Sequence, residues 1–100
     1  MNISISKIQQ IVSEITNISI DEINSASRKA HIVQARHLSM HFSRWNTNLP
    51  MLKIARSHGK ENHATVIHAD ESISFDIKRN SKLKETHEKI KLSINSLSLG

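Results

Sequence analysis

Residues 58–69 read HGKENHATVIHA and join a short amphipathic stretch to a longer one through a single glycine. Gly59 stands where a left-handed residue typically ends a helix, and Asn62 is a favourable N-cap for the helix that follows. A helix, a glycine-containing turn and a second helix are the parts of a helix-turn-helix, in which the N-terminal residues of the second helix enter the major groove of DNA. An ordinary helical hairpin has the same pattern, and the pattern alone leaves both open.

The sequence before the turn predicts four helices. Apolar residues recur every three or four positions over residues 5–18, which indicates a first helix with one buried face. Ser19 begins an S-x-x-E capping box, so a short second helix should start there. After a polar loop at residues 24–29, a long third helix is expected over about residues 30–46. A short fourth should start at Pro50, which a helix tolerates only in its first turn.

The third predicted helix carries both a core stripe and part of the positive charge. Arg36, Ser43 and Arg44 fall away from the stripe, so we expect them to project outward. The residues of the stripe recur at spacings of three, four and three: Ala35, Leu38, Phe42 and Trp45.

Two more helices are expected after the turn. The fifth runs from Asn62 to about Ile77, and the last from about Leu83 to Leu97, with a fraying end over residues 95–100. With two glycines and one proline, the chain has too few turn residues for an all-β fold. The sequence therefore predicts one all-α domain of about six helices over residues 1–100, with its core within about residues 5–94.

The net charge of +5 is concentrated in the middle of the chain. No acidic residue lies within residues 28–60, whereas acids outnumber bases before this block and balance them after it. A block of one sign inside folded sequence indicates a surface for a polyanion, although a solvated basic face is the alternative. The basic residues of the block are Arg28, Lys29, Arg36, Arg44, Lys53, Arg56 and Lys60.

Several function classes are disfavoured by composition and motifs. The absence of cysteine removes disulfides, thiolate metal sites and cysteine nucleophiles, and is compatible with a reducing compartment. No apolar run approaches the ~18 residues of a membrane span, and no basic-then-apolar leader opens the chain. No G-x-x-x-x-G-K-[ST] motif is present, so no ATP site or other cofactor is expected.

The histidines and acids suggest neither a metal site nor an active site. His37 and His41 stand at i,i+4 and could face one ion, but no third ligand is obvious, so exposed helix histidines are the simpler interpretation. Asp70 and Glu71 follow His68 without a nucleophile, and we expect a solvated face. The chain is therefore not expected to be an enzyme.

The segment His58 to Ala69 resembles the signature of the C-terminal DNA-binding domain of the DnaA family of bacterial chromosomal replication initiators. That signature commonly reads G-G-R-D-H-T-T-V-L-H-A. Further points of the sequence fall in register with the family over about residues 5–94, among them Ile8-Gln9, Arg28, Arg36 and the Leu-Pro step at 49–50. The resemblance implies an all-α, Trp-repressor-like helix-turn-helix domain that binds duplex DNA.

The resemblance also implies roles for individual residues. Arg28 matches the arginine that reaches into the minor groove, and Arg36 and His37 match a pair that holds phosphates. The run that matches the major-groove readers is Asn62, His63, Ala64 and Thr65, and His68 matches a histidine close to the DNA backbone. To these we add, from charge alone, Lys29, Arg44 and Lys60 as phosphate contacts.

Departures from the family pattern indicate that the preferred site can differ from the usual DnaA box. Asn62 replaces an aspartate and adds a donor, while Ala64 replaces a hydroxyl residue. His37 replaces a glutamine and would make a pH-dependent contact. Lys60-Glu61 replaces Gly-Arg and lowers the positive charge of the turn.

The expected function is sequence-specific binding of double-stranded DNA in the initiation or regulation of chromosomal replication, by a cytoplasmic, nucleoid-associated monomer. A DnaA-like regulator with altered site preference, or an interaction module for an acidic protein, is the alternative. The chain is either an excised initiator domain or a free-standing protein. Candidate partners besides DNA are the full-length initiator and other replication proteins, with no membrane and no small-molecule substrate.

Overall fold

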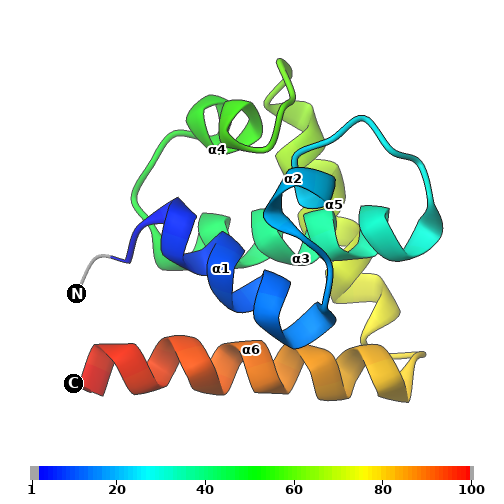
Figure 1. Cartoon of the computed structure of the whole chain (residues 1–100), viewed down its shortest axis with the longest axis vertical. Helices are drawn as coiled ribbons and strands as arrows, with labels where there is room; N and C mark the ends of the chain where they lie inside the picture. Colours follow the sequence, from blue (N-terminus) through cyan, green and yellow to red (C-terminus); the bar gives the residue numbers. More distant parts are fainter. Residues whose placement is uncertain (1–2, 100) are drawn as a thin grey trace.

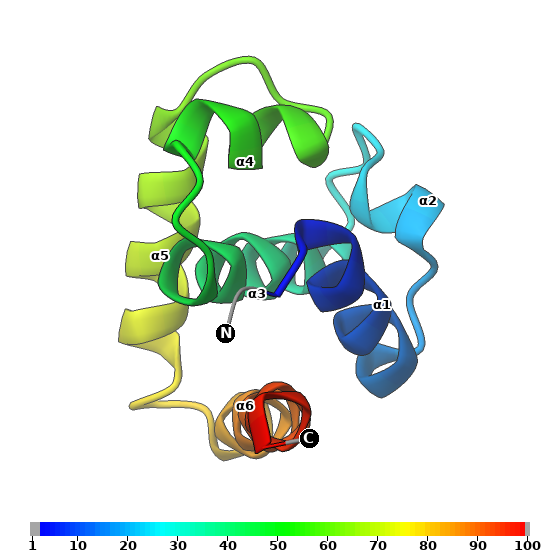
Figure 2. The ribbon, with the colours of Figure 1, turned by 90° about the vertical axis from the view of Figure 1, so that its left-hand side faces the viewer.

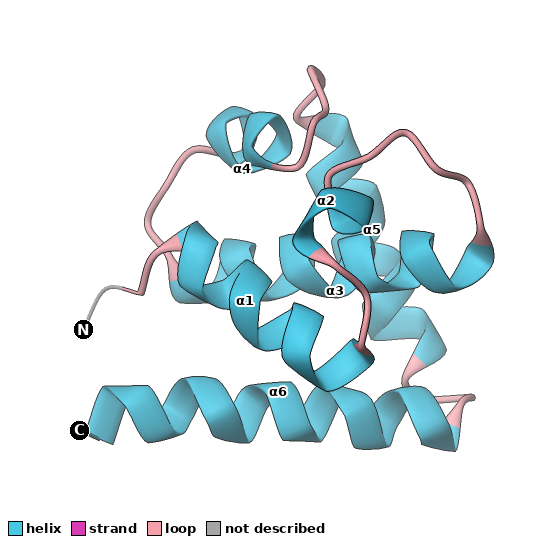
Figure 3. Ribbon diagram, viewed as in Figure 1, coloured by secondary structure: helices cyan, strands magenta, loops and turns pink. Residues whose placement is uncertain are grey.

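The computed structural model describes residues 3–99, with side chains to residue 97, and the regular secondary structure in this part of the chain is helical, without strands. The all-α prediction is therefore confirmed (Figure 3). None of these helices is long and apolar enough to cross a membrane. The helices are α1 (Ile5–Thr16), α2 (Ile20–Ile23), α3 (Ala30–Asn46), α4 (Met51–Ser57), α5 (Ala64–Asp76) and α6 (Ser81–Leu99).

Helix α3 is the centre of the molecule. It packs against α1, α2, α4 and α5, most extensively against α5. Figures 1 and 2 show α1 and α5 on either side of α3, with α4 above it and α6 below. The loop between α2 and α3 and the turn between α4 and α5 both lie at the end of the molecule away from α6 (Figure 1).

The core is aliphatic and consists of two clusters. The larger one joins α1, α2, α3, α6 and the C-terminal part of α5, with Ile8, Val12, Ile23 and Ile90 fully buried. The smaller one packs α4 onto α3 and α5, with Ile54, Ala55 and Val66 fully buried. The helix-turn-helix is therefore supported by its own cluster next to the main core.

Serine side chains cap the starts of the first two helices. The Ser4 hydroxyl accepts from the Lys7 N–H at 3.1 Å and begins α1. The predicted capping box is present, because Ser19 Oγ accepts from the Glu22 N–H at 3.1 Å and the Ser19 N–H donates to Glu22 Oε1 at 3.3 Å. These bonds satisfy amide groups that a helix start otherwise leaves without partners.

The predicted faces of α3 are partly wrong. Trp45 was expected in the core but is 66% exposed, while Arg36 and Ser43, expected outside, are 4% and 0% exposed. The reason is that four other helices cover α3, so nearly its whole circumference is buried and a one-stripe pattern does not describe it. Trp45 lies near the end of α3, and its indole N–H donates to Asp70 Oδ1 at 2.8 Å at the surface.

Helix α6 extends slightly further in both directions than the sequence predicts. Asn80 Oδ1 accepts from the Leu83 N–H at 3.0 Å and caps the helix start. At the other end α6 continues to Leu99, so residues 95–97 are helical with exposed side chains. Gly100, the end of the segment expected to fray, lies outside the described residues.

Candidate nucleic-acid interface

The turn between α4 and α5 ends α4 in a Schellman motif. The Gly59 N–H donates to Arg56 O at 3.1 Å and the Lys60 N–H donates to Ala55 O at 2.9 Å. Gly59 has a φ of 77°, which confirms the predicted left-handed residue. A side chain here would also overlap the backbone oxygen of Asn24. Glycine is thus required both by backbone conformation and by a close approach.

The predicted reading residues lie at the exposed start of α5. Asn62 Oδ1 accepts from the Ala64 N–H at 2.8 Å, so Asn62 makes the capping bond that was expected of it, but the residue directly before α5 is His63, which makes no side-chain capping bond. Thr65 Oγ1 donates to the Asn62 carbonyl at 2.7 Å and closes the same turn. Asn62, His63 and Ala64 are exposed and Thr65 is half-buried. Side chains presented at a helix start in this way are available to a ligand approaching along the axis of α5.

The loop at residues 24–29 is held from below by Arg36. Its Nε donates to Ile23 O at 2.7 Å, and Nη1 to Ser27 O at 3.1 Å. Nη2 donates to Ser25 O at 2.8 Å and to Glu22 O at 3.4 Å. Backbone carbonyls of this irregular loop therefore have hydrogen-bond partners. The backbone just before the exposed Arg28 is held in place by these bonds.

Arg36 has a structural function that sequence reasoning did not foresee. Four of the five N–H donors of a guanidinium are used, two on carbonyls of α2 and two on carbonyls of the loop. Burial lowers the pKa of Arg36, although an arginine stays charged at any physiological pH. Its contact with phosphate stays a prediction, but its charge already stabilises the loop that carries Arg28.

A surface hollow of about 570 Å³ joins the loop, the turn and the start of α5. We call it the basic hollow. It contains no acidic residue, and all but one of its lining residues were predicted from the sequence to contact DNA, the exception being Met40. The lining residues are Arg28, Arg36, His37, Met40, Lys60, Ala64, Thr65 and His68.

Positive charges crowd one another in the basic hollow. Partial burial lowers the pKa of Lys60, and the nearby Arg36 and Arg28 lower it further. Because Arg28 and Lys60 come from the loop and the turn respectively, an anion between them would relieve repulsion across the two segments. The hollow is therefore electrostatically suited to a phosphate group.

His37 and His68 lie together on one wall of the basic hollow. Their ring centroids are 5.6 Å apart with perpendicular planes. Burial, with the charges of His68 and Arg36, lowers the pKa of His37 to about 4, and Asp76 opposes the shift. At neutral pH His37 is therefore uncharged and offers a hydrogen bond rather than a positive charge.

Arg44 lies outside the basic hollow, bound within the fold. It donates to Asp70 Oδ2 at 2.9 Å, and its guanidinium lies 5.6 Å from the centroid of the Trp45 ring. The expectation of a solvated Asp70 is wrong, because this carboxylate is 7% exposed and also binds His41. Its partners lie on α3, so no local pattern around Asp70 indicates them.

The remaining predicted residues are exposed but do not line the basic hollow. Lys29 lies beside Arg28, and His63 beside Ala64.

His41 is not the exposed helix histidine that was expected, since it is 9% exposed and bonded to Asp70 and His87. Within residues 3–99 no three His, Asp or Glu side chains are arranged to hold a metal ion.

Two further residues shape this region and were missed in the sequence. His58 is fully buried, with Nε2 2.6 Å from Ser39 Oγ and Nδ1 2.7 Å from Ile54 O, so it fixes the end of α4 to α3. Gln9 is 7% exposed and donates to the loop and to α4. Gln9 had a signal, because it stands four residues after Ile5 in the apolar stripe of α1.

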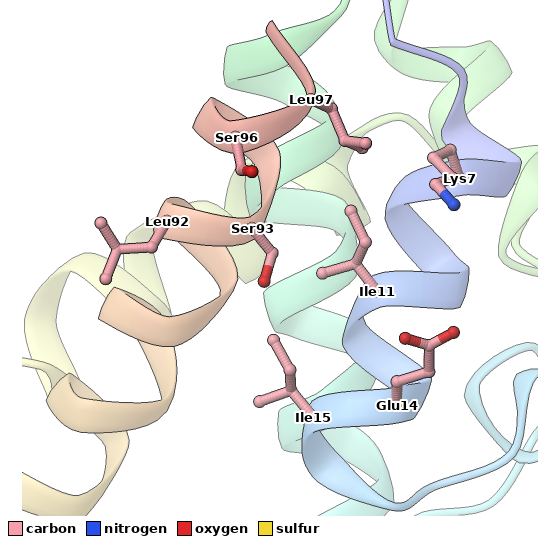
Figure 4. Close-up of a pocket in the computed structure, with 8 residues that line it drawn as sticks. All are labelled: Lys7, Ile11, Glu14, Ile15, Leu92, Ser93, Ser96 and Leu97. Carbon is pink, nitrogen blue, oxygen red and sulfur yellow. The ribbon is translucent and has the colours of Figure 1, made fainter. Parts of the chain in front are cut away.

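A second hollow, of about 370 Å³, lies between α1 and α6 (Figure 4). Ile11 and Ile15 of α1 point toward α6, and the charged lining residues are Lys7 and Glu14. Its charges are balanced, unlike those of the basic hollow. The basic hollow is therefore the better candidate for binding a polyanion.

Comparison with known proteins agrees with this geometry. A family model described as the bacterial dnaA protein helix-turn-helix matches residues 5–73, which include every residue that lines the basic hollow. A chromosomal replication initiator protein DnaA from Mycoplasma capricolum is 33% identical over 92 residues, or 92% of this chain. The chain spans about 20% of the length of that relative.

Proposed function

Because this chain belongs to the family of bacterial DnaA helix-turn-helix domains, we propose that it binds specific sites on double-stranded DNA in the initiation or regulation of chromosomal replication. The observation that carries the proposal is the basic hollow, which brings the loop of Arg28 next to the exposed start of α5. A duplex presents phosphates and base edges side by side, so it can contact the loop and the start of α5 at once. It therefore fits this surface better than an acidic peptide does.

In the proposed complex, different side chains bind the DNA backbone and contact the base edges. Arg28 enters the minor groove, while Lys29, His37, Lys60 and His68 hold phosphates. Arg36 and Arg44 add charge, but their donors are used within the fold. Bases are read by the exposed start of α5, from Asn62 to Thr65.

In this proposal the side-chain amide nitrogen of Asn62 donates a hydrogen bond to a DNA base. Its oxygen accepts from the Ala64 N–H, and no acceptor within residues 3–99 binds its amide nitrogen. An exposed amide nitrogen in the major groove seeks an acceptor, such as N7 of a purine. Thr65 similarly uses its hydroxyl proton inside the turn and presents its methyl group and an acceptor.

The proposed module acts without catalysis or cofactor, as a cytoplasmic monomer associated with the nucleoid. The full-length initiator and other replication proteins are its candidate partners. Sedimentation of the free chain and of its complex with a short duplex tests the monomeric state, since a second copy would add about 11 kDa.

Footprinting on genomic fragments tests the proposal directly. We expect reproducible protection of short sites at ~0.15 M salt, where non-specific contacts are weakened but specific ones persist. Uniform or absent protection at this salt concentration would overturn it. Protection that is specific but absent from a standard DnaA box would indicate an altered site preference.

A further inference from the structure

Gln9 connects the loop of Arg28 to the turn between α4 and α5, the two segments on either side of the basic hollow. Gln9 itself does not line the hollow. It lies on α1 and is 7% exposed. Its Nε2 donates to Asn24 Oδ1 at 2.9 Å and to Ser57 O at 3.0 Å. Asn24 is the C-cap of α2, where the loop of Arg28 begins, and Ser57 is the last residue of α4 before the turn. One amide group therefore binds both segments.

The same two segments touch directly at Gly59. Its Cα lies so close to the Asn24 carbonyl oxygen that any Cβ would overlap it. This contact is independent of Gln9 and places the left-handed residue of the turn against the first residue of the loop. Two separate features thus fix the turn against the loop.

The rest of the loop is held by Arg36. Its bonds to the carbonyls of Ile23, Ser25 and Ser27 leave Arg28 one residue beyond a fixed point. Lys60 is likewise one residue beyond Gly59. Arg28 and Lys60, the two cations on either side of the basic hollow, therefore each follow directly after a backbone position that is held in place.

We propose that Gln9 is a positioning residue that couples the Arg28 loop to the helix-turn-helix turn, so that minor-groove and major-groove contacts are made in one fixed register. This inference rests on the proposed function. Binding at two places adds fully only when their spacing is preset, because otherwise the association must also order the loop. A duplex fixes the spacing of its two grooves, so a rigid protein junction favours simultaneous contact.

The chemistry of glutamine suits this position. Two acceptors face its nitrogen, and a carboxylate of the same shape would meet the Ser57 carbonyl with a like partial charge. Methionine has a similar length and fills the space without donating. Gln9→Met therefore removes the two hydrogen bonds by which Gln9 joins the segments, leaves the Gly59 contact in place and retains the packing of α1.

The test compares the contribution of Arg28 to DNA affinity in three backgrounds: wild type, Gln9→Met, and Ile8→Val as a matched control. Ile8 is fully buried on the same helix, so its truncation weakens the core but not the junction. All variants are measured at a temperature where circular dichroism shows them folded. Arg28→Ala should weaken binding to a selected site about tenfold in wild type and in Ile8→Val, but less than about threefold in Gln9→Met.

An equal loss in all three backgrounds would overturn the coupling. NMR of the free chain gives a second readout that does not depend on DNA. Gln9→Met should shift and broaden amide signals of both residues 25–28 and residues 57–60, whereas changes confined to α1 would also overturn it. If the shifts appear but wild type protects no DNA site, the junction stands and the proposed function fails instead.

Discussion

Asn62 has two tasks at the start of α5, and they use different atoms. Its oxygen caps the helix through the Ala64 N–H, while its nitrogen faces solvent. Aspartate also caps well, so Asn62→Asp keeps the first task and replaces the donor of the second with an acceptor. We expect unfolding free energy to change by less than about 0.5 kcal/mol.

The same substitution should change which base is preferred. Binding should weaken by about 1–3 kcal/mol for duplexes whose contacted base offers an acceptor. It should strengthen by a similar amount for duplexes whose contacted base offers an amino donor. Competitive binding of duplexes that differ at single positions measures this shift. A uniform loss across all duplexes would show that Asn62 holds the helix but does not read DNA.

Arg36 illustrates how a charged residue can act on the fold rather than on the ligand. Arg36→Ala removes four hydrogen bonds to carbonyls of α2 and of the loop, so we expect unfolding free energy to fall by about 3 kcal/mol. Urea denaturation measures the loss. The control is Arg28→Ala, an exposed residue that should change stability by less than about 0.5 kcal/mol. Equal stability of the two variants would contradict this function.

His37 should make both stability and DNA binding depend on pH. Its pKa of about 4 in the fold lies below the unfolded value of about 6.5, so the unfolded chain binds more protons between these values. Its stability contribution is present above about pH 6.5 and is lost as the pH falls toward 4. A phosphate nearby favours the charged ring, so DNA affinity should instead rise as the pH falls from 7.5 to 5.5.

His37→Gln separates this effect from the other histidines. Glutamine hydrogen-bonds without titrating, so the variant should flatten the acid gain in affinity, by about threefold between pH 7.5 and 5.5. Fluorescence anisotropy at constant ionic strength measures it. His31→Gln, on the exposed start of α3, is the matched control and should retain the wild-type slope. Unchanged slopes in both variants would exclude His37 as a phosphate contact.

At the scale of elements, end signals were predictable and side-chain partners were not. The capping box at Ser19 and the left-handed Gly59 depend on residues within a few positions, so the sequence shows them directly. The burial of Ser43 and the exposure of Trp45 depend on which helices cover α3. The site follows the same rule: Asn62 was recognised as a cap, whereas the anchoring of Arg36 and the bonds of Gln9 join distant segments.

Helix α6 is attached to the central helix through a pair of histidines. His41 Nδ1 lies 2.6 Å from Asp70 Oδ1 and donates to it, because a carboxylate only accepts. His41 Nε2 and His87 Nε2 lie 3.0 Å apart, so one of these two nitrogens donates and the other accepts. This geometry has no room for a second proton between the rings. Burial lowers the pKa of His87, as do His41 and Lys91, while Glu88 opposes the shift.

Acid should therefore loosen α6 before the rest of the fold. A lowered pKa means that the contribution of His87 is present above about pH 6.5 and is lost below it. Hydrogen exchange of α6 amides, corrected for intrinsic rates, should be several-fold faster at pH 5 than at pH 7. His87→Gln can still hydrogen-bond to His41 and does not titrate, so it should remove most of this difference. An identical pH dependence in that variant would contradict the histidine mechanism.

For the whole molecule, the net charge overstates what DNA can use. Among the seven basic residues of the block at 28–60, Arg36 is bound to carbonyls and Arg44 to Asp70, and Arg56 pairs with Glu61 at 3.4 Å. Four remain without an acidic partner among the described residues: Arg28, Lys29, Lys53 and Lys60. They come from the loop, from α4 and from the turn, so the fold gathers the available charge at the end opposite α6 (Figure 1).

This distribution predicts how DNA binding responds to salt. Each neutralised phosphate contributes about −0.9 to the slope of log affinity against log salt, so four free cations give about −3.5, whereas all seven would give about −6. At pH 7.5 the neutral His37 adds nothing to the slope. Lys60→Ala should reduce the slope by about 1, and Lys84→Ala, at an exposed position on α6, should leave it unchanged. Anisotropy titrations between 50 and 300 mM salt, about a sixfold range, resolve these values. A wild-type slope near −6 would mean that Arg36, Arg44 and Arg56 leave their partners for phosphates, and that the fold rearranges when it meets DNA.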